Sequence, residues 1–272
     1  MKRTVAGARA LFVIASGLAF LFTVAFAAPS YADRISTIEQ VKVSIVAVGT
    51  FERTRTPPFQ FRGTGFVVDD GTLIVTNAHV LPPLLEAAKM EGLAILVVAP
   101  NKESLDLAPT QVQVREAKQI AVDPGSDLAV LRIAAPALPA LKIRASDAVK
   151  EGQEVLFTGY PIGAVLGAFP ATHRGMISAI TPIAIPQARA GELDPRLIKR
   201  LSSGPFAVFQ LDATAYPGNS GSPIYDPDSG EVLGVINMVF VKGTKESALT
   251  QPSGITYAVP ASHLRELLKK SR

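Results

Sequence analysis

Residues 215–223 read AYPGNSGSP and place one serine, Ser220, between two glycines, with a proline on each side of the cluster. Glycine adopts positive φ without strain, asparagine tolerates it and proline presets φ, so these residues alone predict a tight turn. A turn of this kind can also expose the serine hydroxyl for chemistry. The surrounding sequence has to decide between the two interpretations.

The composition is that of an ordinary globular protein. The chain has 272 residues, 48% of them hydrophobic, and this length allows one large domain or two small ones. It contains no cysteine, which excludes disulfides, a thiolate nucleophile and cysteine-ligated metal sites. The formal charge of +4 owes much to Lys2, Arg3 and Arg9, and without residues 1–32 the balance is close to neutral. We therefore expect no nucleic-acid partner.

The N-terminal segment has the pattern of a secretory signal peptide. A basic start is followed by an apolar stretch over residues 10–28 and by small residues at Ser30 and Ala32. This pattern predicts a signal peptide over residues 1–32, cleaved before Asp33, and hence a protein that is periplasmic or secreted. The apolar stretch is also about long enough to span a bilayer, so an uncleaved membrane anchor is the alternative.

After Asp33 the sequence consists of short apolar runs separated by turn residues. Each run has the length of a β-strand and helical periods are few, which favours an all-β barrel or sandwich over alternating βα units. The runs are SIVAVG (44–49), GTGFVV (63–68), GTLIVT (71–76), LAILVVAP (93–100), TQVQV (110–114), DLAVLRI (127–133), EVLFTG (154–159), MISAI (176–180), FAVFQLD (206–212), EVLGVINMVFV (231–241) and GITYAV (254–259).

Alternation and helical periodicity add detail to this all-β pattern. Val112 and Val114 alternate with glutamines, which predicts a half-buried strand. Helices are expected only at the periphery, one after Pro83 and one over residues 261–272 at the end of the chain. Residues 186–205 are polar without strand alternation, which indicates a surface loop.

A serine becomes a nucleophile only when a base takes its proton, and the base needs a third group to orient it. The chain has three histidines that could be the base. His263 begins the terminal helix, where we expect an exposed residue, and His173 precedes an apolar run, where we expect a structural or surface role. His79 directly follows the run LIVT and precedes a turn, a position that can expose an imidazole at the rim of a barrel.

Asp127 is the candidate third group. It begins the apolar run DLAVLRI, where a carboxylate must be paired, capped or exposed. Capping of a turn around Pro124 and Gly125 by Asp123 and Asp127 is the alternative interpretation. The signals from the serine, the histidine and the aspartate are each weak alone, but their conjunction indicates nucleophilic catalysis.

Three segments, in this order, resemble the catalytic motifs of trypsin-like serine peptidases, most closely the HtrA-type proteases of bacterial envelopes: TNAHV (76–80), DPGSDLAVLRI (123–133) and QLDATAYPGNSGSP (210–223). The resemblance extends to GTGFVVDDGTLIVTNAHV (63–80), GYPIG (159–163) and GITYAVP (254–260) and covers nearly all of the chain after residue 32. It implies a peptidase domain over residues 33–272, made of two packed six-stranded antiparallel barrels that divide near residues 145–152, followed by the C-terminal helix. The active site is expected in the cleft between the barrels.

The resemblance also implies roles for the candidate residues. Ser220 is the expected nucleophile, His79 the general base and then acid, and Asp127 the group that orients the imidazole. The oxyanion hole is expected in the loop Gly218, Asn219 and Ser220, with the N–H groups of Gly218 and Ser220 facing the oxygen of the tetrahedral intermediate. No metal or other cofactor is implied.

Two residues of the serine motif depart from relatives. Asn219 stands where digestive relatives have an aspartate that pairs with a new N-terminal amine, so we expect no zymogen switch of that kind. Ser222 stands where HtrA-type proteases more often have glycine, which could narrow the floor of the site. The PDZ domain usual in HtrA-type proteases is also missing from the expected domains, because only the terminal helix follows the last strand.

The substrate pocket implied by the resemblance has Thr214 near its base. Asn237, Met238, Ile255 and Tyr257 are expected as its walls, although all five could equally be ordinary barrel core. Because Thr214 is not a carboxylate, we expect a preference for small or medium apolar side chains rather than arginine or lysine.

We therefore predict an exported serine endopeptidase that hydrolyses protein or peptide substrates through an acyl-enzyme, in envelope protein quality control or processing. The alternative is a catalytically inactive protein of the same fold that binds or scaffolds partners. An unrelated metal or nucleic-acid binder is disfavoured, because the histidines lack metal-ligand spacing and the charge after residue 32 is near neutral.

Overall fold

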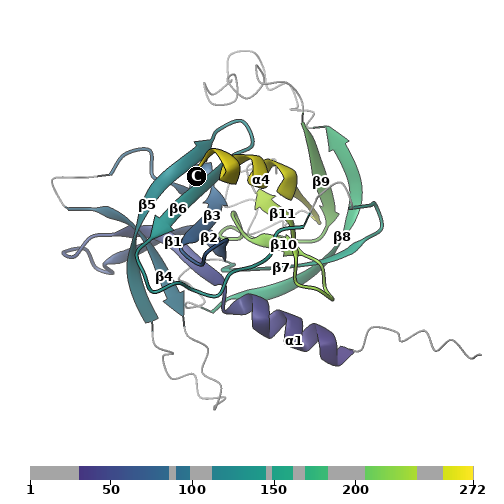
Figure 1. Ribbon diagram of the computed structural model, residues 1–272, viewed down its shortest axis with the longest axis horizontal. Coiled ribbons are helices and arrows are strands. Elements are labelled where there is room, and N and C mark those ends of the chain that lie inside the picture. The colour runs from purple at the N-terminus through teal and green to yellow at the C-terminus, as the bar shows by residue number, and fades with distance from the viewer. Residues whose placement is uncertain are drawn as a thin grey trace, which may run out of the picture.

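The computed structural model describes residues 31–85, 90–98, 112–144, 149–161, 169–182, 206–237 and 254–271. These residues form two closed barrels of six antiparallel strands each. The barrels lie side by side, with helix α4 (Ala261–Lys270) above and helix α1 (Tyr31–Lys42) below in the view of Figure 1. The prediction of two six-stranded antiparallel barrels with a C-terminal helix is confirmed. Closure leaves neither sheet with a free edge.

The first barrel contains β1 to β6, hydrogen-bonded in the order β1-β2-β3-β6-β5-β4. Branched side chains such as Val48, Ile74 and Leu131 are fully buried in its interior. The 3-10 helix η1 (Ala78–Val80) follows β3 directly. The strands are β1 (Ile45–Phe51), β2 (Phe59–Val68), β3 (Leu73–Asn77), β4 (Gly92–Val98), β5 (Val112–Asp123) and β6 (Leu128–Ile133).

The second barrel contains β7 to β12, in the order β10-β11-β12-β9-β8-β7. Phe157, Phe209 and Ile236 fill its interior. The predicted division near residues 145–152 falls in the segment between β6 and β7. The strands are β7 (Glu154–Gly159), β8 (Ala171–Pro182), β9 (Ala207–Asp212), β10 (Pro223–Tyr225), β11 (Val232–Asn237) and β12 (Ile255–Pro260).

A third hydrophobic cluster joins the barrels. Phe66 from β2, Val235 from β11 and Leu264 from the helix α4 (Ala261–Lys270) are all fully buried in it. Each such side chain contributes about 1.5–3 kcal/mol when buried, so the seam between the barrels is part of the core. The imidazole of His263 packs against Phe206 at 4.7 Å between ring centroids and is half-buried, so its expected exposure is wrong.

The interpretation of the first part of β5 is also wrong. Val112 and Val114 are 49% and 38% exposed, whereas the buried residues of this strand are Arg115 and Ala117. Arg115 is buried because its guanidinium donates to the carbonyl of Pro136 at 2.8 Å and to that of Ala134. A long arginine with carbonyl acceptors can occupy a position that a hydropathy pattern assigns to solvent.

Other sequence expectations lie wholly or partly outside the described residues. These are the signal segment over residues 1–32, except for its last two residues, the polar loop 186–205 and most of the helix expected after Pro83. The structure instead contains an unexpected helix, α1 (Tyr31–Lys42), which packs Val41 into the cluster between the barrels. In the described part of the chain, no helix combines the length and apolar character needed to cross a membrane.

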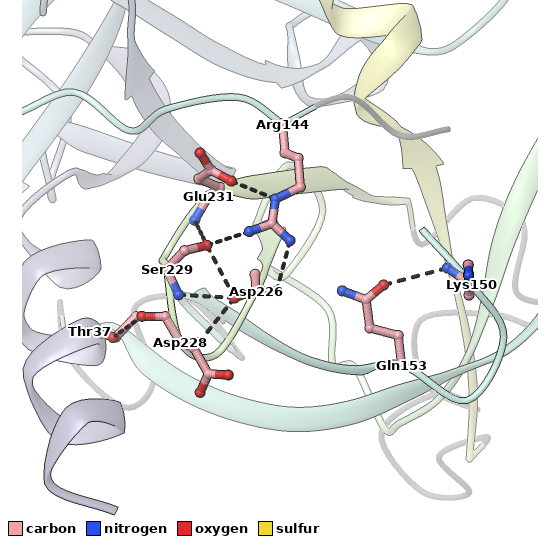
Figure 2. A network of polar contacts seen from close by, with 8 residues as sticks. All are labelled: Thr37, Arg144, Lys150, Gln153, Asp226, Asp228, Ser229 and Glu231. Atoms are coloured by element: carbon pink, nitrogen blue, oxygen red, sulfur yellow. Dashed lines mark hydrogen bonds and ion pairs between the residues drawn. The ribbon is translucent and has the colours of Figure 1, made fainter. Parts of the chain in front are cut away.

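Arg144, in the segment between the barrels, binds the turn between β10 and β11 (Figure 2). Its guanidinium donates to Asp226 Oδ2 at 2.9 Å, to Ser229 Oγ at 2.7 Å and to the carboxylate of Glu231. The hydroxyl of Thr37 on α1 donates to a backbone carbonyl of the same turn at 3.3 Å. The connecting segment and the N-terminal helix are therefore both attached to one hairpin of the second barrel.

We predict that Arg144→Met lowers the free energy of unfolding by about 1 kcal/mol, since these ion pairs are partly exposed. Burial raises the pKa of Asp226, but the N–H of Ser229 and the charge of Arg144 outweigh it and hold the pKa below its ordinary value. A carboxyl group whose pKa is lower in the folded than in the unfolded state stabilises the fold at pH values above its unfolded pKa of about 4. This stabilisation is lost as the pH falls through the lower pKa of the folded state. Calorimetry from pH 7 to pH 2 should therefore show the difference between wild type and variant shrinking with acid, and a constant difference would contradict this.

Candidate active site

His79 lies where the first barrel opens toward the second. β3 ends at Asn77, and the 3-10 turn that follows directs the imidazole out of the barrel wall. The side chain is 27% exposed, so one edge of the ring remains accessible. Its backbone N–H donates to Asp127 Oδ1 at 2.9 Å, which fixes the turn to the loop before β6.

Asp127 is held in an unusual backbone conformation. Its φ of 56° lies in the left-handed region, which a residue with a side chain adopts only when its surroundings impose it. The amide of Asn77 and the N–H of Ala78 both donate to its carbonyl at 3.0 Å. Asp123 does cap this turn, accepting from the hydroxyl of Ser126 at 2.7 Å. Asp123 therefore caps the turn, as the alternative interpretation expected, whereas the carboxylate of Asp127 accepts hydrogen bonds from His79.

The two glycines that flank Ser220 are required by the backbone of its loop. Gly218 has a φ of 103° and Gly221 a φ of 87°, both in the region that favours glycine. A Cβ on Gly221 would also overlap the carbonyl of Thr64. The turn is closed by hydrogen bonds from Asn219 N to the Tyr216 carbonyl and from Ser222 N to the Asn219 carbonyl.

The three candidate side chains form one continuous hydrogen-bonded chain. Ser220 Oγ lies 2.9 Å from His79 Nε2, and His79 Nδ1 lies 2.6 Å from Asp127 Oδ2. Asp127 is only 6% exposed, so the carboxylate faces the imidazole with little access to water. The structure therefore brings together a hydroxyl, a base within proton-transfer distance and a carboxylate that orients the base.

Thr64 on β2 holds the serine loop against the first barrel. Its N–H donates to the Ser220 carbonyl at 2.9 Å and its hydroxyl to the Gly218 carbonyl at 2.7 Å. The same hydroxyl accepts from Tyr160 N at 3.0 Å, and the Thr64 carbonyl accepts from the hydroxyl of Thr76 at 2.7 Å. The sequence analysis missed Thr64, since nothing in the run GTGFVV distinguishes this threonine from a barrel residue.

The loop leaves two backbone donors unused. Within the described residues, neither Gly218 N–H nor Ser220 N–H donates a hydrogen bond, whereas Asn219 N–H is bound to Tyr216. The side-chain amide of Asn219 and the hydroxyl of Ser222 are fully buried and have no hydrogen-bond partner among the residues that the structure describes. Unpaired buried polar atoms cost stability, which is a common feature of sites built for chemistry.

The expected pocket residues differ in how far they are exposed. Thr214 is partly exposed, and the N–H of its neighbour Ala213 donates to the Gly254 carbonyl at 3.0 Å, which places Thr214 near the start of β12. On β12 itself Ile255 is 45% exposed and Tyr257 is partly exposed, and Met238 lies outside the described residues. Asn237 is fully buried and its amide donates to Asp127 Oδ2 at 2.8 Å, a contact that the sequence analysis did not anticipate.

His173 lies on β8 of the second barrel and packs among aromatic rings. Its ring stacks on Phe157 at 4.8 Å between centroids and lies 6.2 Å from the ring of Tyr216. Burial lowers the pKa of its imidazole, so the ring is neutral at pH 7. The expectation of a structural role fits this packing. Across the described residues, no three side chains of histidine, aspartate or glutamate gather closely enough to hold a metal ion.

Comparison with known proteins agrees with this fold. Residues 63–235 match the model of the trypsin-like peptidase domain, and the chain belongs to this family. The chain is similar to two proteins described as probable periplasmic serine endoprotease DegP-like. One, from Pseudomonas fulva, is 30% identical over 75% of this chain and 33% of the relative, and the other, from Brucella suis, is 31% identical over 76% and 32%. The chain thus spans about one third of the length of these relatives.

Solved structures give the same picture of the fold. A structure described as the HtrA-type protease AlgW with tripeptide superimposes with a TM-score of 0.57 at 23% identity, and the match covers 89% of this chain and 63% of that chain. The structure of Deg5 superimposes with a TM-score of 0.58 at 20% identity and covers 86% and 91%. At these identities the likeness concerns the fold.

We predict that Gly159→Ala destabilises the site, because its Cβ would overlap the hydroxyl of Ser222 and lie 2.9 Å from both Asn219 Oδ1 and Thr64 Oγ1. Overpacking of this kind costs about 1–3 kcal/mol. The second substitution Ser222→Gly removes the closest of these atoms, so urea denaturation should show the double variant more stable than Gly159→Ala alone. Equal stability of the single and the double variant would show that the contact between residue 159 and the hydroxyl of Ser222 does not constrain the loop.

Proposed function

We propose that the protein is a serine endopeptidase that cleaves protein or peptide substrates through an acyl-enzyme. One observation carries the proposal, the chain of hydrogen bonds from Ser220 Oγ to His79 Nε2 and from His79 Nδ1 to Asp127. Family membership and the names of the DegP-like relatives support it. Because the chain spans only a third of those relatives, the activity is proposed for this chain from its own residues.

In the first half of the reaction, Ser220 Oγ attacks the carbonyl carbon of the scissile peptide bond while its proton passes to His79 Nε2. Asp127 holds Nδ1–H and stabilises the imidazolium that results. The N–H groups of Gly218 and Ser220 are the proposed donors to the oxyanion. The imidazolium then gives its proton to the leaving amine, the C–N bond breaks, and the acyl group remains on Ser220 as an ester.

In the second half, water attacks the ester. His79 takes a proton from the water, and a second tetrahedral intermediate forms in the same oxyanion site. Its collapse returns the proton to Ser220 Oγ and releases the carboxylic acid product. Every proton that leaves a reactant in this sequence is returned by His79, so the chain's own residues suffice for both halves.

The pocket beside this site is proposed to accept small or medium apolar side chains. Thr214 has no charge to pair with an arginine or lysine of the substrate, and the neighbouring Ile255 presents an exposed apolar surface. Tyr257 and Met238 remain proposed parts of its walls, to which Asn237 would contribute only its backbone, since its side chain is buried against Asp127.

We further propose that the protein is exported and acts in the cell envelope, in quality control or processing of proteins there. The pattern of residues 1–32 and the word periplasmic in the names of the relatives support this location. Protein or peptide chains would then be its partners.

The nucleophile is tested by labelling. Purified wild-type protein should cleave an unfolded protein and be labelled by a fluorophosphonate on Ser220, located by mass spectrometry of the tryptic peptide, because the probe reacts with a serine activated by a base. Ser220→Ala is the matched control and should lose both labelling and cleavage. Labelling of wild type no stronger than that of the control would instead favour a catalytically inactive protein of this fold.

The pocket is tested by Thr214→Asp. A carboxylate at the base of the pocket should attract a basic side chain, so the ratio of kcat/KM for a lysine peptide over the matched alanine peptide should rise by about 10-fold, as expected for one charged contact. Thr214→Asn, of the same shape without the charge, is the control. If the ratio of kcat/KM is unchanged in Thr214→Asp, the substrate side chain does not bind next to residue 214.

A further inference from the structure

Three N–H donors surround the carboxylate of Asp127. His79 provides two of them, its backbone N–H to Oδ1 at 2.9 Å and its ring Nδ1 to Oδ2 at 2.6 Å. The third is the side-chain amide of Asn237, which donates to Oδ2 at 2.8 Å. Only this third donor comes from the second barrel, and unlike His79 it takes no part in the movement of protons.

The backbone around Asn237 is tied to the loop of the nucleophile. Asn237 ends β11 and pairs with Tyr257 on β12. The preceding residue, Ile236, donates its N–H to the Ser222 carbonyl at 2.8 Å and accepts from Gly221 N at 3.1 Å. One strand therefore carries both the residues that bind the serine loop and the amide that binds Asp127.

Both barrels hold Asp127. Asn77 and Ala78 of the first barrel bind its backbone carbonyl. Its carboxylate is bound by His79 of the first barrel and by Asn237 of the second. Without Asn237 both donors to the carboxylate would come from His79, which leaves the carboxylate free to shift with that residue about its terminal torsion, which is broad. The amide of Asn237, fully buried and set on a paired strand, removes that freedom.

We propose that Asn237 is a positioning residue that orients the carboxylate of Asp127 toward His79 and couples its placement to that of Ser220. This inference rests on the proposed function and extends it. The amide does not touch substrate and acts only through Asp127. A neutral donor is required, because a second carboxylate at this distance would compete with Asp127 for a proton.

The test compares Asn237→Asp and Asn237→Ala with Val235→Ala. Asn237→Asp keeps the shape of the side chain and replaces the donor by an acceptor. Val235 is buried on the same strand and its side chain cannot form a hydrogen bond, so its variant reports the cost of loosening β11 without removing a donor to Asp127. Each variant is assayed with a peptide substrate from pH 5 to pH 9, and its thermal midpoint is recorded.

Both Asn237 variants should lower kcat by about 10- to 100-fold, the value of a hydrogen bond to a charged group, and leave KM within about two-fold. The deficit of Asn237→Asp should diminish as the pH falls, since two adjacent carboxyls then share a proton and one can donate to the other. Asn237→Ala has no titrating group and should not recover. A wild-type kcat in both variants, or losses in kcat no larger than that of Val235→Ala, would overturn the proposal.

A second readout separates this proposal from the proposed function. The low-field proton resonance of His79 Nδ1–H reports its hydrogen bond to Asp127 whether or not the protein cleaves peptides. It should broaden at a lower temperature in Asn237→Ala than in wild type or Val235→Ala, because the bond opens to solvent more often. An inactive wild type would overturn the peptidase proposal, whereas an unchanged resonance in Asn237→Ala would overturn the role of Asn237.

Discussion

The contact of Thr64 with the serine loop is the constraint on which the arrangement of the site depends. His79 and Asp127 belong to the first barrel and Ser220 to the second, so their meeting requires the two barrels to be held in one relative position. Thr64 N–H and Oγ1 bind the carbonyls of Ser220 and Gly218 directly across this seam. The hydrophobic cluster shared by the barrels supplies most of the free energy of association, and these directional bonds fix the register.

Two glycines allow the contact between Thr64 and the serine loop. Gly221 presses its backbone against the Thr64 carbonyl, and Gly159 leaves room for the hydroxyl of Ser222. In this loop, as far as the described residues show, the N–H groups of Gly218 and Ser220 and the buried side-chain polar atoms of Asn219 and Ser222 have no hydrogen-bond partner. Unpaired buried polar atoms cost stability, whereas the catalysis proposed for this loop needs donors held in a fixed arrangement.

The strands could be predicted because each carries its own apolar pattern and its own turn residues, which are local signals, whereas their division into two six-stranded barrels came from the resemblance to trypsin-like peptidases. His79, Asp127 and Ser220 could be predicted as candidates because each lies in a short local motif beside a strand or in a turn, and the structure brings their side chains together. The contacts of Thr64 and Asn237 could not be predicted in this way, because they join segments more than a hundred residues apart. The prediction that Val112 lies on the buried face was wrong, because alternation identifies the two faces of a strand without showing which face packs against the core.

The most direct measurement of the central claim is the site at which a peptidyl chloromethyl ketone alkylates the protein. Such a reagent places its carbonyl carbon on an activated serine and its methylene carbon on the base beside it, so it reacts with both only when they face one substrate. The account predicts that mass spectrometry finds the inhibitor on the imidazole of His79 and that Ser220→Ala prevents this modification. An unmodified His79 in a protein whose Ser220 reacts with the reagent would contradict the claim that these two side chains act on one bond.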